Sequence, residues 1–185
     1  MYACMRAGGL YLRRSKVLLI DANPISEHKN EGKLIREFLN IIEVKSDYKR
    51  VKSKRELLEL LEKRKHGIIH ISAHGEKDGI CVGRGKVTAN DILDKGEQRK
   101  ANGLRKVRLV ICSACHGGCK DVANAFSKVI CKLYLGPKRI TYWIDTAFLS
   151  IYFYNYYYHK NFTLEKAIES AFQKRHYKGD WYIFP

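Results

Sequence analysis

Two short apolar segments of this chain are each followed by a residue that can take part in nucleophilic catalysis. The segment 68–72 (IIHIS) leads into His74 and Gly75, and the segment 107–112 (VRLVIC) leads into Cys115. An imidazole beside a thiol keeps the thiol ionised as the attacking thiolate and later protonates the leaving amine. A cysteine protease needs this pair, with His74 as the general base and Cys115 as the nucleophile.

The glycine after His74 supports the same interpretation. Gly75 allows the backbone to approach a substrate closely, so that its N–H can form an oxyanion hole together with the N–H of Cys115. Gly117 and Gly118 allow a tight exit from the second segment into the next helix. Taken alone, His74 would be interpreted as a loop histidine and Cys115 as a small buried hydrophobe. Their joint occurrence favours catalysis.

Three other motifs use the same cysteines. Cys112 to His116 fits the C-x-x-C-H string of haem attachment, but that string needs export and an exposed loop, whereas Cys112 ends an apolar strand. A thioredoxin-like C-x-x-C pair would follow the first strand of its fold rather than a later one. A zinc site from Cys112, Cys115, His116 and Cys119 lacks a second C-x-x-C knuckle, and adjacent ligands fit one tetrahedron poorly. The sequence therefore predicts no metal and no cofactor.

The order of apolar runs and amphipathic stretches predicts the elements that must position these residues. The predicted strands are 17–20, 48–52, 68–72, 107–112, 139–143 and 180–184, a small hairpin spans 79–87, and the predicted helices are 31–43, 53–66, 88–93, 121–133, 146–159 and 163–176. Strands that alternate with helices indicate βαβ units, a largely parallel sheet and helices on both faces. In such sheets the reactive groups lie just past the carboxyl ends of the strands.

The composition limits the class of protein. The chain has 185 residues, 45% of them hydrophobic and 29% charged, which suits one domain with a real core and excludes a disordered chain. We expect a single domain over residues 16–185 after an N-terminal extension at 1–15. The N-terminus lacks the apolar region of a secretory signal, and the most membrane-like stretch, 146–158, is well short of the ~20 residues of a spanning helix. We therefore expect a cytoplasmic protein with no membrane span, in which the six cysteines do not form a disulfide framework.

The charge of the chain suggests a different function. Lys and Arg number 35 against 19 Asp and Glu, which gives a formal charge of +16. Basic clusters at 49–55, 63–65 and 99–108 raise the alternative of a nucleic-acid-binding module. Such clusters are usually solvated faces, and the sequence has no RRM, KH or helix-turn-helix signature, so nucleic acid is not the favoured partner. The charge is expected to attract acidic substrates or activators and to make activity depend on ionic strength.

At these motifs the sequence resembles the caspase-like cysteine peptidase superfamily, which includes caspases, metacaspases, legumain, separase and gingipain. The segment 113–117 (SACHG) looks like the caspase element Q-A-C-x-G. The order of motifs over residues 16–185 is most similar to the CHAT-domain branch: IIHISAHG, GICVGRGKV, VRLVICSAC, TYWID, YFYNYYY, LEKAIESAF and DWYIF. The resemblance implies an α/β fold of the caspase-like kind, a three-layer αβα sandwich with a mainly parallel sheet.

The resemblance also implies an intracellular cysteine endopeptidase that cleaves protein or peptide substrates through an acyl-enzyme. It assigns His74 as the general base, Cys115 as the nucleophile, and Gly75 with the Cys115 backbone as the oxyanion site. CHAT-like proteases usually act as effectors that a partner switches on, so an activator protein or self-association is implied, together with a role in prokaryotic defence or cell death. The alternative is a catalytically inactive caspase-like scaffold or a basic nucleic-acid-binding module.

Three further residues are candidates for substrate binding. Ser113 stands where metacaspases carry an acidic residue, so the resemblance does not support a metacaspase-style acidic pocket for Arg or Lys. Asp145 follows the predicted strand 139–143 and is the remaining acidic candidate, unless it caps the helix after it. His116 is a candidate for the rim of the site.

Overall fold

The computed structural model describes residues 16–24, 30–63, 66–117, 119–174 and 181–185. The predicted extension 1–15 and Asp180, at the start of the last predicted strand, lie outside the described residues. Strands and helices alternate along the described chain in this order: β1 Val17–Asp21, α1 Glu31–Ile41, β2 Ser46–Arg50, α2 Lys54–Lys63, β3 Ile68–Ser72, β4 His74–Glu76, β5 Gly79–Val82, β6 Gly85–Val87, α3 Ala89–Ala101, β7 Val107–Cys112, α4 Lys120–Ala125, the π-helical segment η1 Phe126–Ile130, β8 Cys131–Pro137, α5 Trp143–Tyr154, the π-helical segment η2 Asn155–His159, α6 Leu164–Gln173 and β9 Trp181–Phe184.

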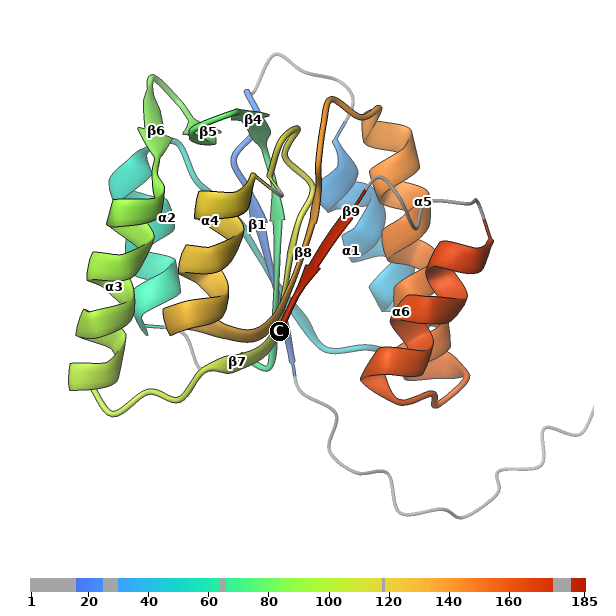
Figure 1. The fold of residues 1–185 in the computed structure, drawn as a ribbon. Coiled ribbons are helices and arrows are strands. Elements are labelled where there is room, and N and C mark those ends of the chain that lie inside the picture. Colours follow the sequence, from blue (N-terminus) through green and yellow to red (C-terminus); the bar gives the residue numbers. More distant parts are fainter. Residues whose placement is uncertain (1–15, 25–29, 64–65, 118, 175–180) are drawn as a thin grey trace, which may run out of the picture.

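A central sheet of six described strands has the order β2-β1-β3-β7-β8-β9 (Figure 1). The first five strands run parallel to one another, and β9 pairs antiparallel with β8 at the edge. The predicted fold class, α/β with a mainly parallel sheet, is confirmed. The predicted hairpin forms β5 and β6, and β4 joins it in a second, three-stranded antiparallel sheet.

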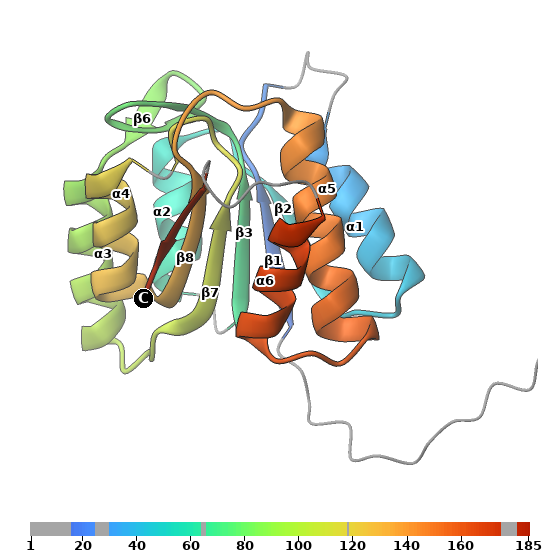
Figure 2. The same cartoon turned by 45° about the vertical axis from the view of Figure 1, so that its right-hand side comes forward.

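Helices cover both faces of the central sheet, as Figure 2 shows from the side. Within β1, Leu18 and Ile20 belong to the buried cluster that includes side chains of α2, α3 and α4, while Val17 and Leu19 belong to the cluster that includes side chains of α1, α5 and α6. Successive strand side chains point to opposite faces, so a strand that is apolar at every position is buried on both. The molecule therefore has the three layers that the sequence predicts.

Local hydrogen bonds explain where two of the helices begin. The side chain of Asn30 accepts a hydrogen bond from the backbone N–H of Lys33 and so caps α1. At α2, the Ser53 hydroxyl accepts from the N–H of Glu56. The Glu56 carboxylate accepts from the N–H of Lys52, one residue earlier than a capping box requires.

Two predictions about the second half of the chain are wrong. The helix predicted over 121–133 ends at Ile130, and β8 begins at Cys131. The strand predicted over 139–143 is a connection, and α5 begins at Trp143. Ile140 and Tyr142 are 76% and 78% exposed. Both residue types favour strands, but no described strand pairs with this segment.

The aromatic run near the C-terminus packs inside the molecule. Phe153 and Tyr157 lie buried against the sheet, and their rings stack at a centroid distance of 5.6 Å. The predicted helix over 146–159 is thus present as α5 and η2, with its aromatic side chains in the core. Among the described helices, none is long and apolar enough to cross a bilayer.

Candidate active site

The parallel pairing of β3 with β7 brings the two predicted catalytic residues to the same edge of the sheet. Ile71 of β3 lies opposite Cys112 of β7. His74 is three residues past Ile71 (74 − 71), and Cys115 is three residues past Cys112 (115 − 112). The backbone N–H of Ser113 still donates to the carbonyl of Ile71 at 2.8 Å, so the two strand ends are held side by side up to this point.

His74 and Cys115 line one cavity of about 460 Å³ at the carboxyl ends of the strands. This volume lies within the range of small-molecule and peptide side-chain sites. The loops after β1, β3, β7 and β8 and the first turns of α1 and α5 contribute its walls, with these residues: Asn23, Glu31, Ser72, Ala73, His74, Ser113, Cys115, Thr141, Tyr142, Trp143 and Thr146.

Gly75 packs directly against the backbone of Cys115. A Cβ atom at Gly75 would lie 2.1 Å from the carbonyl oxygen of Cys115 and 2.9 Å from the Cβ of Ala114. Only glycine fits at this separation, because no real Cβ approaches a carbonyl oxygen so closely. The structure therefore brings together the two residues whose N–H groups the sequence assigns to an oxyanion hole.

The turn that carries Cys115 is held by the loop after β8. The Cys115 thiol donates to the carbonyl of Thr141 at 3.5 Å, and the N–H of His116 donates to the carbonyl of Arg139 at 3.3 Å. His116 adopts a φ of 52°, a left-handed conformation that is uncommon for a side chain other than glycine. This backbone geometry turns the chain sharply after Cys115 and leaves Cys115 facing the cavity.

The three substrate-binding candidates occupy different places. Ser113 lines the cavity. Asp145 lies in the first turn of α5, where a negative charge is favourable near the helix dipole, and it is not among the lining residues. The cap position of α5 belongs to Tyr142. His116 lies beside a shallower depression formed with the β4–β5 turn, outside the cavity.

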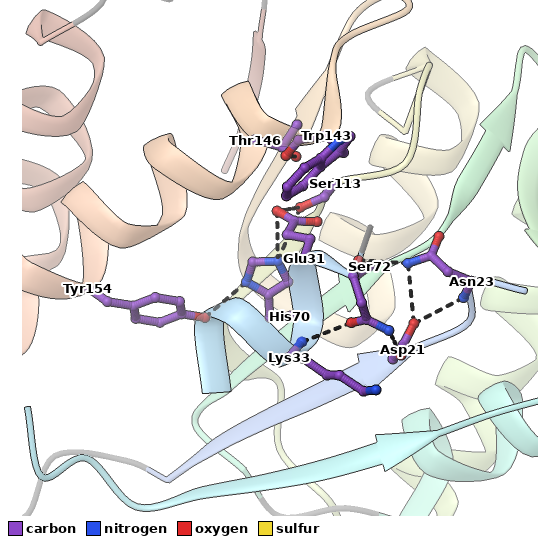
Figure 3. A network of polar contacts seen from close by, with 11 residues as sticks. Asp21, Asn23, Glu31, Lys33, His70, Ser72, Ser113, Trp143, Thr146 and Tyr154 are labelled. Carbon is purple, nitrogen blue, oxygen red and sulfur yellow. Dashed lines mark hydrogen bonds and ion pairs between the residues drawn. The ribbon is translucent and has the colours of Figure 1, made fainter. Parts of the chain in front are cut away.

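Glu31 is a charged lining residue that the sequence pattern did not indicate. It is the first residue of α1 and is only 3% exposed. Figure 3 shows it at the end of a chain of hydrogen bonds from Tyr154 through His70 and Ser113. The distances are 3.1 Å from Tyr154 Oη to His70 Nδ1, 3.1 Å from His70 Nε2 to Ser113 Oγ, and 2.8 Å from Ser113 Oγ to Glu31 Oε1.

A second buried carboxylate, Asp21, lies at the end of β1 (Figure 3). It accepts hydrogen bonds from the Tyr48 hydroxyl, from the side chain of Asn30 at 2.6 Å, and from the backbone and side chain of Asn23. Burial and this neighbouring carboxylate raise the pKa of Tyr48 to about 12, so the phenol remains a donor. The Asn23 side chain also donates to Ser72, which ties the wall of the cavity to Asp21.

Cys112 and Cys131 are in different environments from Cys115. Burial raises the pKa of Cys112 to about 11 and that of Cys131 to about 12. Cys112 thus lies in the core, whereas Cys115 lines the cavity. No group of three or more His, Cys, Asp or Glu side chains in the described residues is arranged to hold a metal ion.

These environments predict selective alkylation of the native protein. At pH 8, Cys115 is expected to react with iodoacetamide while Cys112 and Cys131 stay unmodified, because a thiol with a pKa near 11 is ionised to only about one part in a thousand. Peptide mapping by mass spectrometry measures the modification at each site. Both core cysteines are expected to react once the chain is unfolded in denaturant; equal rates for Cys112 and Cys115 in the native protein would contradict the assignment.

Comparison with known proteins defines the fold. No family model matches the chain, and no curated protein matches it. Among solved structures it is similar to gingipain R, described as an Arg-specific cysteine proteinase, with a TM-score of 0.62 and 11% identity, covering 91% of this chain and 45% of that chain. This likeness confirms the caspase-like fold, and the chain spans less than half the length of that proteinase. A reconstructed ancestor of vitamin kinases matches with a TM-score of only 0.40, at 12% identity over 87% of this chain and 98% of that one, too low a score to indicate a shared fold.

Proposed function

We propose that this chain is a cysteine endopeptidase in which Cys115 attacks the peptide carbonyl and His74 acts as the general base. The proposal rests on one observation. The His74 imidazole and the Cys115 thiol line the same cavity, at the exits of two neighbouring parallel strands. The caspase-like fold supports it, because a solved structure with that fold is a cysteine proteinase. The CHAT-like order of motifs makes the CHAT branch the proposed subgroup.

In the proposed reaction, His74 takes the thiol proton and the Cys115 thiolate bonds to the carbonyl carbon. The N–H groups of Gly75 and Cys115 stabilise the oxyanion that forms. The C–N bond then breaks as the His74 imidazolium donates its proton to the leaving amine, which leaves an acyl-enzyme. Water, deprotonated by His74, attacks this thioester, and the carboxylic acid product and the free thiol are released.

The contact of the Cys115 thiol with the Thr141 carbonyl bears on activation. In this arrangement the thiol donates its proton to a backbone oxygen rather than to an imidazole. An activator protein, or a second copy of the chain, that shifts the loop after β8 would free the thiol for His74. A role as an effector in defence or regulated cell death fits such control.

The direct test is detection of the acyl-enzyme and of new peptide ends. The protein is incubated with a peptide library, and mass spectrometry identifies the new termini and any acyl group on Cys115. Internal cleavage that stops when Cys115 is carboxamidomethylated supports the proposal. Cleavage that continues after complete alkylation of Cys115 overturns it, as does failure of peptidyl acyloxymethyl ketones, which trap thiol nucleophiles, to modify Cys115.

A further inference from the structure

We propose that the depression beside His116 binds the residue that follows the cleaved bond, and that Ile140 makes it select an apolar side chain at that position. This inference rests on the proposed function and deepens it, because it concerns the leaving side of the substrate. The depression has a volume of about 380 Å³, within the range of ligand sites. Its lining residues are Gly75, Glu76, Lys77, Asp78, His116 and Ile140.

The depression adjoins the cavity that Cys115 lines. Three pairs of consecutive residues contribute to both, because the first member of each pair lines the cavity and the second lines the depression. The pairs are His74 and Gly75, Cys115 and His116, and Thr141 and Ile140. They follow β3, β7 and β8, which are neighbours in the central sheet. The boundary between the cavity and the depression therefore runs through the residues of the proposed reaction.

Hydrogen bonds from the Cys115 turn hold the segment that contains Ile140. The carbonyl of Arg139 accepts from the N–H of His116 at 3.3 Å, and the carbonyl of Thr141 accepts from the Cys115 thiol at 3.5 Å. Ile140 lies between these two acceptors in the chain. A large apolar side chain is thus held next to the turn that carries the reacting sulfur.

The proposed reaction assigns the depression to the leaving side of the substrate. In the acyl-enzyme, the residue before the cleaved bond stays bonded to Cys115, and Cys115 lines the cavity. The proposed oxyanion site, formed by the N–H groups of Gly75 and Cys115, lies at the boundary of the cavity and the depression. The peptide that follows the cleaved bond must leave the cavity across this boundary. Its first side chain then reaches the depression.

The charges of the depression balance one another. The Lys86 ammonium donates to Glu76 and to Asp78, each at 2.6 Å. Its hydrogen bond holds the pKa of Asp78 below the usual range, so the carboxylate and the ammonium both stay charged near neutral pH. Lys77 supplies a second cation against the two carboxylates. A charged substrate side chain of either sign therefore gains little here, because exposed ion pairs are weak.

Ile140 gives the depression its large apolar surface. A single exposed apolar residue is common on proteins, and Ile41, at the end of α1, is similarly exposed. Ile41, however, lines neither the cavity nor the depression, whereas Ile140 lies beside the reacting groups. An apolar substrate side chain that packs on Ile140 removes apolar surface of both groups from water, which a polar side chain of the same size does not do.

The test uses two thiol reagents that differ in polarity but hardly in shape, chloroacetyl-leucine amide and chloroacetyl-asparagine amide. The Cys115 sulfur bonds to the methylene carbon, chloride leaves, and the thiol proton passes to a base. Neither reagent has a side chain on the acyl side, so the leucine or asparagine side chain extends to the leaving side. Peptide mapping measures the rate at Cys115, relative to glutathione, for the wild type, for Ile140→Thr and for Ile41→Thr as the matched control.

For the wild type and Ile41→Thr we expect the leucine reagent to react about 10-fold faster than the asparagine reagent, since burial of a few methylene groups has an effect of this size. Ile140→Thr keeps a β-branched side chain but loses most of the apolar surface, so the preference should fall to about threefold or less. Thermal unfolding checks that each variant is folded. If Ile140→Thr does not fold, the wild-type comparison of the two reagents decides.

A second readout tests the leaving side through acyl transfer. A peptide that the wild type cleaves is incubated with leucine amide or asparagine amide, which compete with water for the acyl-enzyme. The amine nitrogen bonds to the thioester carbonyl carbon, the C–S bond breaks, and His74 carries the amine proton to the sulfur. Mass spectrometry measures the new peptide. Leucine amide is expected to capture about 10-fold more acyl groups than asparagine amide, and Ile140→Thr should lose this advantage.

The outcomes separate this inference from the proposed function. Equal rates of the two reagents in the wild type overturn the apolar depression, and so does a leucine preference that Ile140→Thr leaves intact. Peptide cleavage with equal acyl transfer to the two amides also overturns it, while the peptidase stands. A leucine preference at Cys115 that is lost in Ile140→Thr, without cleavage of any peptide, supports the apolar depression and counts against the peptidase.

Discussion

Replacing Cys115 with alanine is expected to abolish peptide cleavage, lowering kcat/KM by about 10⁴-fold or more, because the variant has no atom that can form the acyl-enzyme. Replacing His74 with alanine is expected to cost about 10²- to 10⁴-fold, the usual contribution of a general base. Because the two residues act on one proton, the double variant should be little worse than Cys115→Ala alone. Steady-state kinetics on a fluorogenic peptide measure all three variants.

The matched control for Cys115→Ala is Cys119→Ala. Cys119 is also a half-buried free cysteine, four residues farther along the same turn, but it does not line the cavity. We expect Cys119→Ala to retain wild-type activity within a few-fold. If Cys115→Ala loses much less than the expected factor of about 10⁴ in kcat/KM, at an unchanged thermal unfolding temperature, another group is the nucleophile.

The Gly75→Ala variant is expected to lose at least about 100-fold in kcat/KM, because a displacement of about 1 Å at a reacting group has an effect of this size. The added methyl carbon would lie 2.1 Å from the Cys115 carbonyl oxygen, and that oxygen belongs to the backbone, which cannot swing aside as a flexible side chain can. The strand end that carries Gly75 must therefore move away from Cys115. We expect kcat/KM to fall while the protein stays folded, because Gly75 does not belong to the hydrophobic core.

Gly85→Ala provides the control in the same small sheet. A Cβ at Gly85 meets the Cβ of Lys54 at 3.4 Å and a carbonyl at 3.6 Å, which is ordinary contact. We expect normal activity and a similar unfolding temperature. Full activity in Gly75→Ala would mean that the close packing of Gly75 on Cys115 has no role in catalysis.

The parts of the site that could be predicted from sequence are those that depend on local pattern. Apolar runs identify β3 and β7 as buried strands, and the rule that reactive groups follow strand ends then points to His74 and Cys115. The exits of these two strands lie side by side because β3 and β7 pair directly. The fold class followed from the same alternation of strands and helices.

The rest could not be predicted because it depends on tertiary contacts. Glu31 begins an amphipathic helix, and nothing in its local spacing shows that this helix start faces Cys115. The run from Val129 to Leu135 contains both a helical and an alternating pattern of apolar residues, so local sequence does not show that the helix ends at Ile130. The burial of Tyr134 and Leu135 in the sheet decides between the two.

The hydrogen-bond chain that ends at Glu31 also determines when in folding the site is completed. Its three links join residues 84, 43 and 82 positions apart, and they connect α5, β3, the exit of β7 and α1. Contacts between such distant segments form late, because each one closes a long loop at an entropic cost. A chain still under synthesis, with α5 not yet made, has His74 and Cys115 but lacks the link from Tyr154 to His70. The hydrogen bonds that support this wall of the cavity are therefore complete only in the finished molecule.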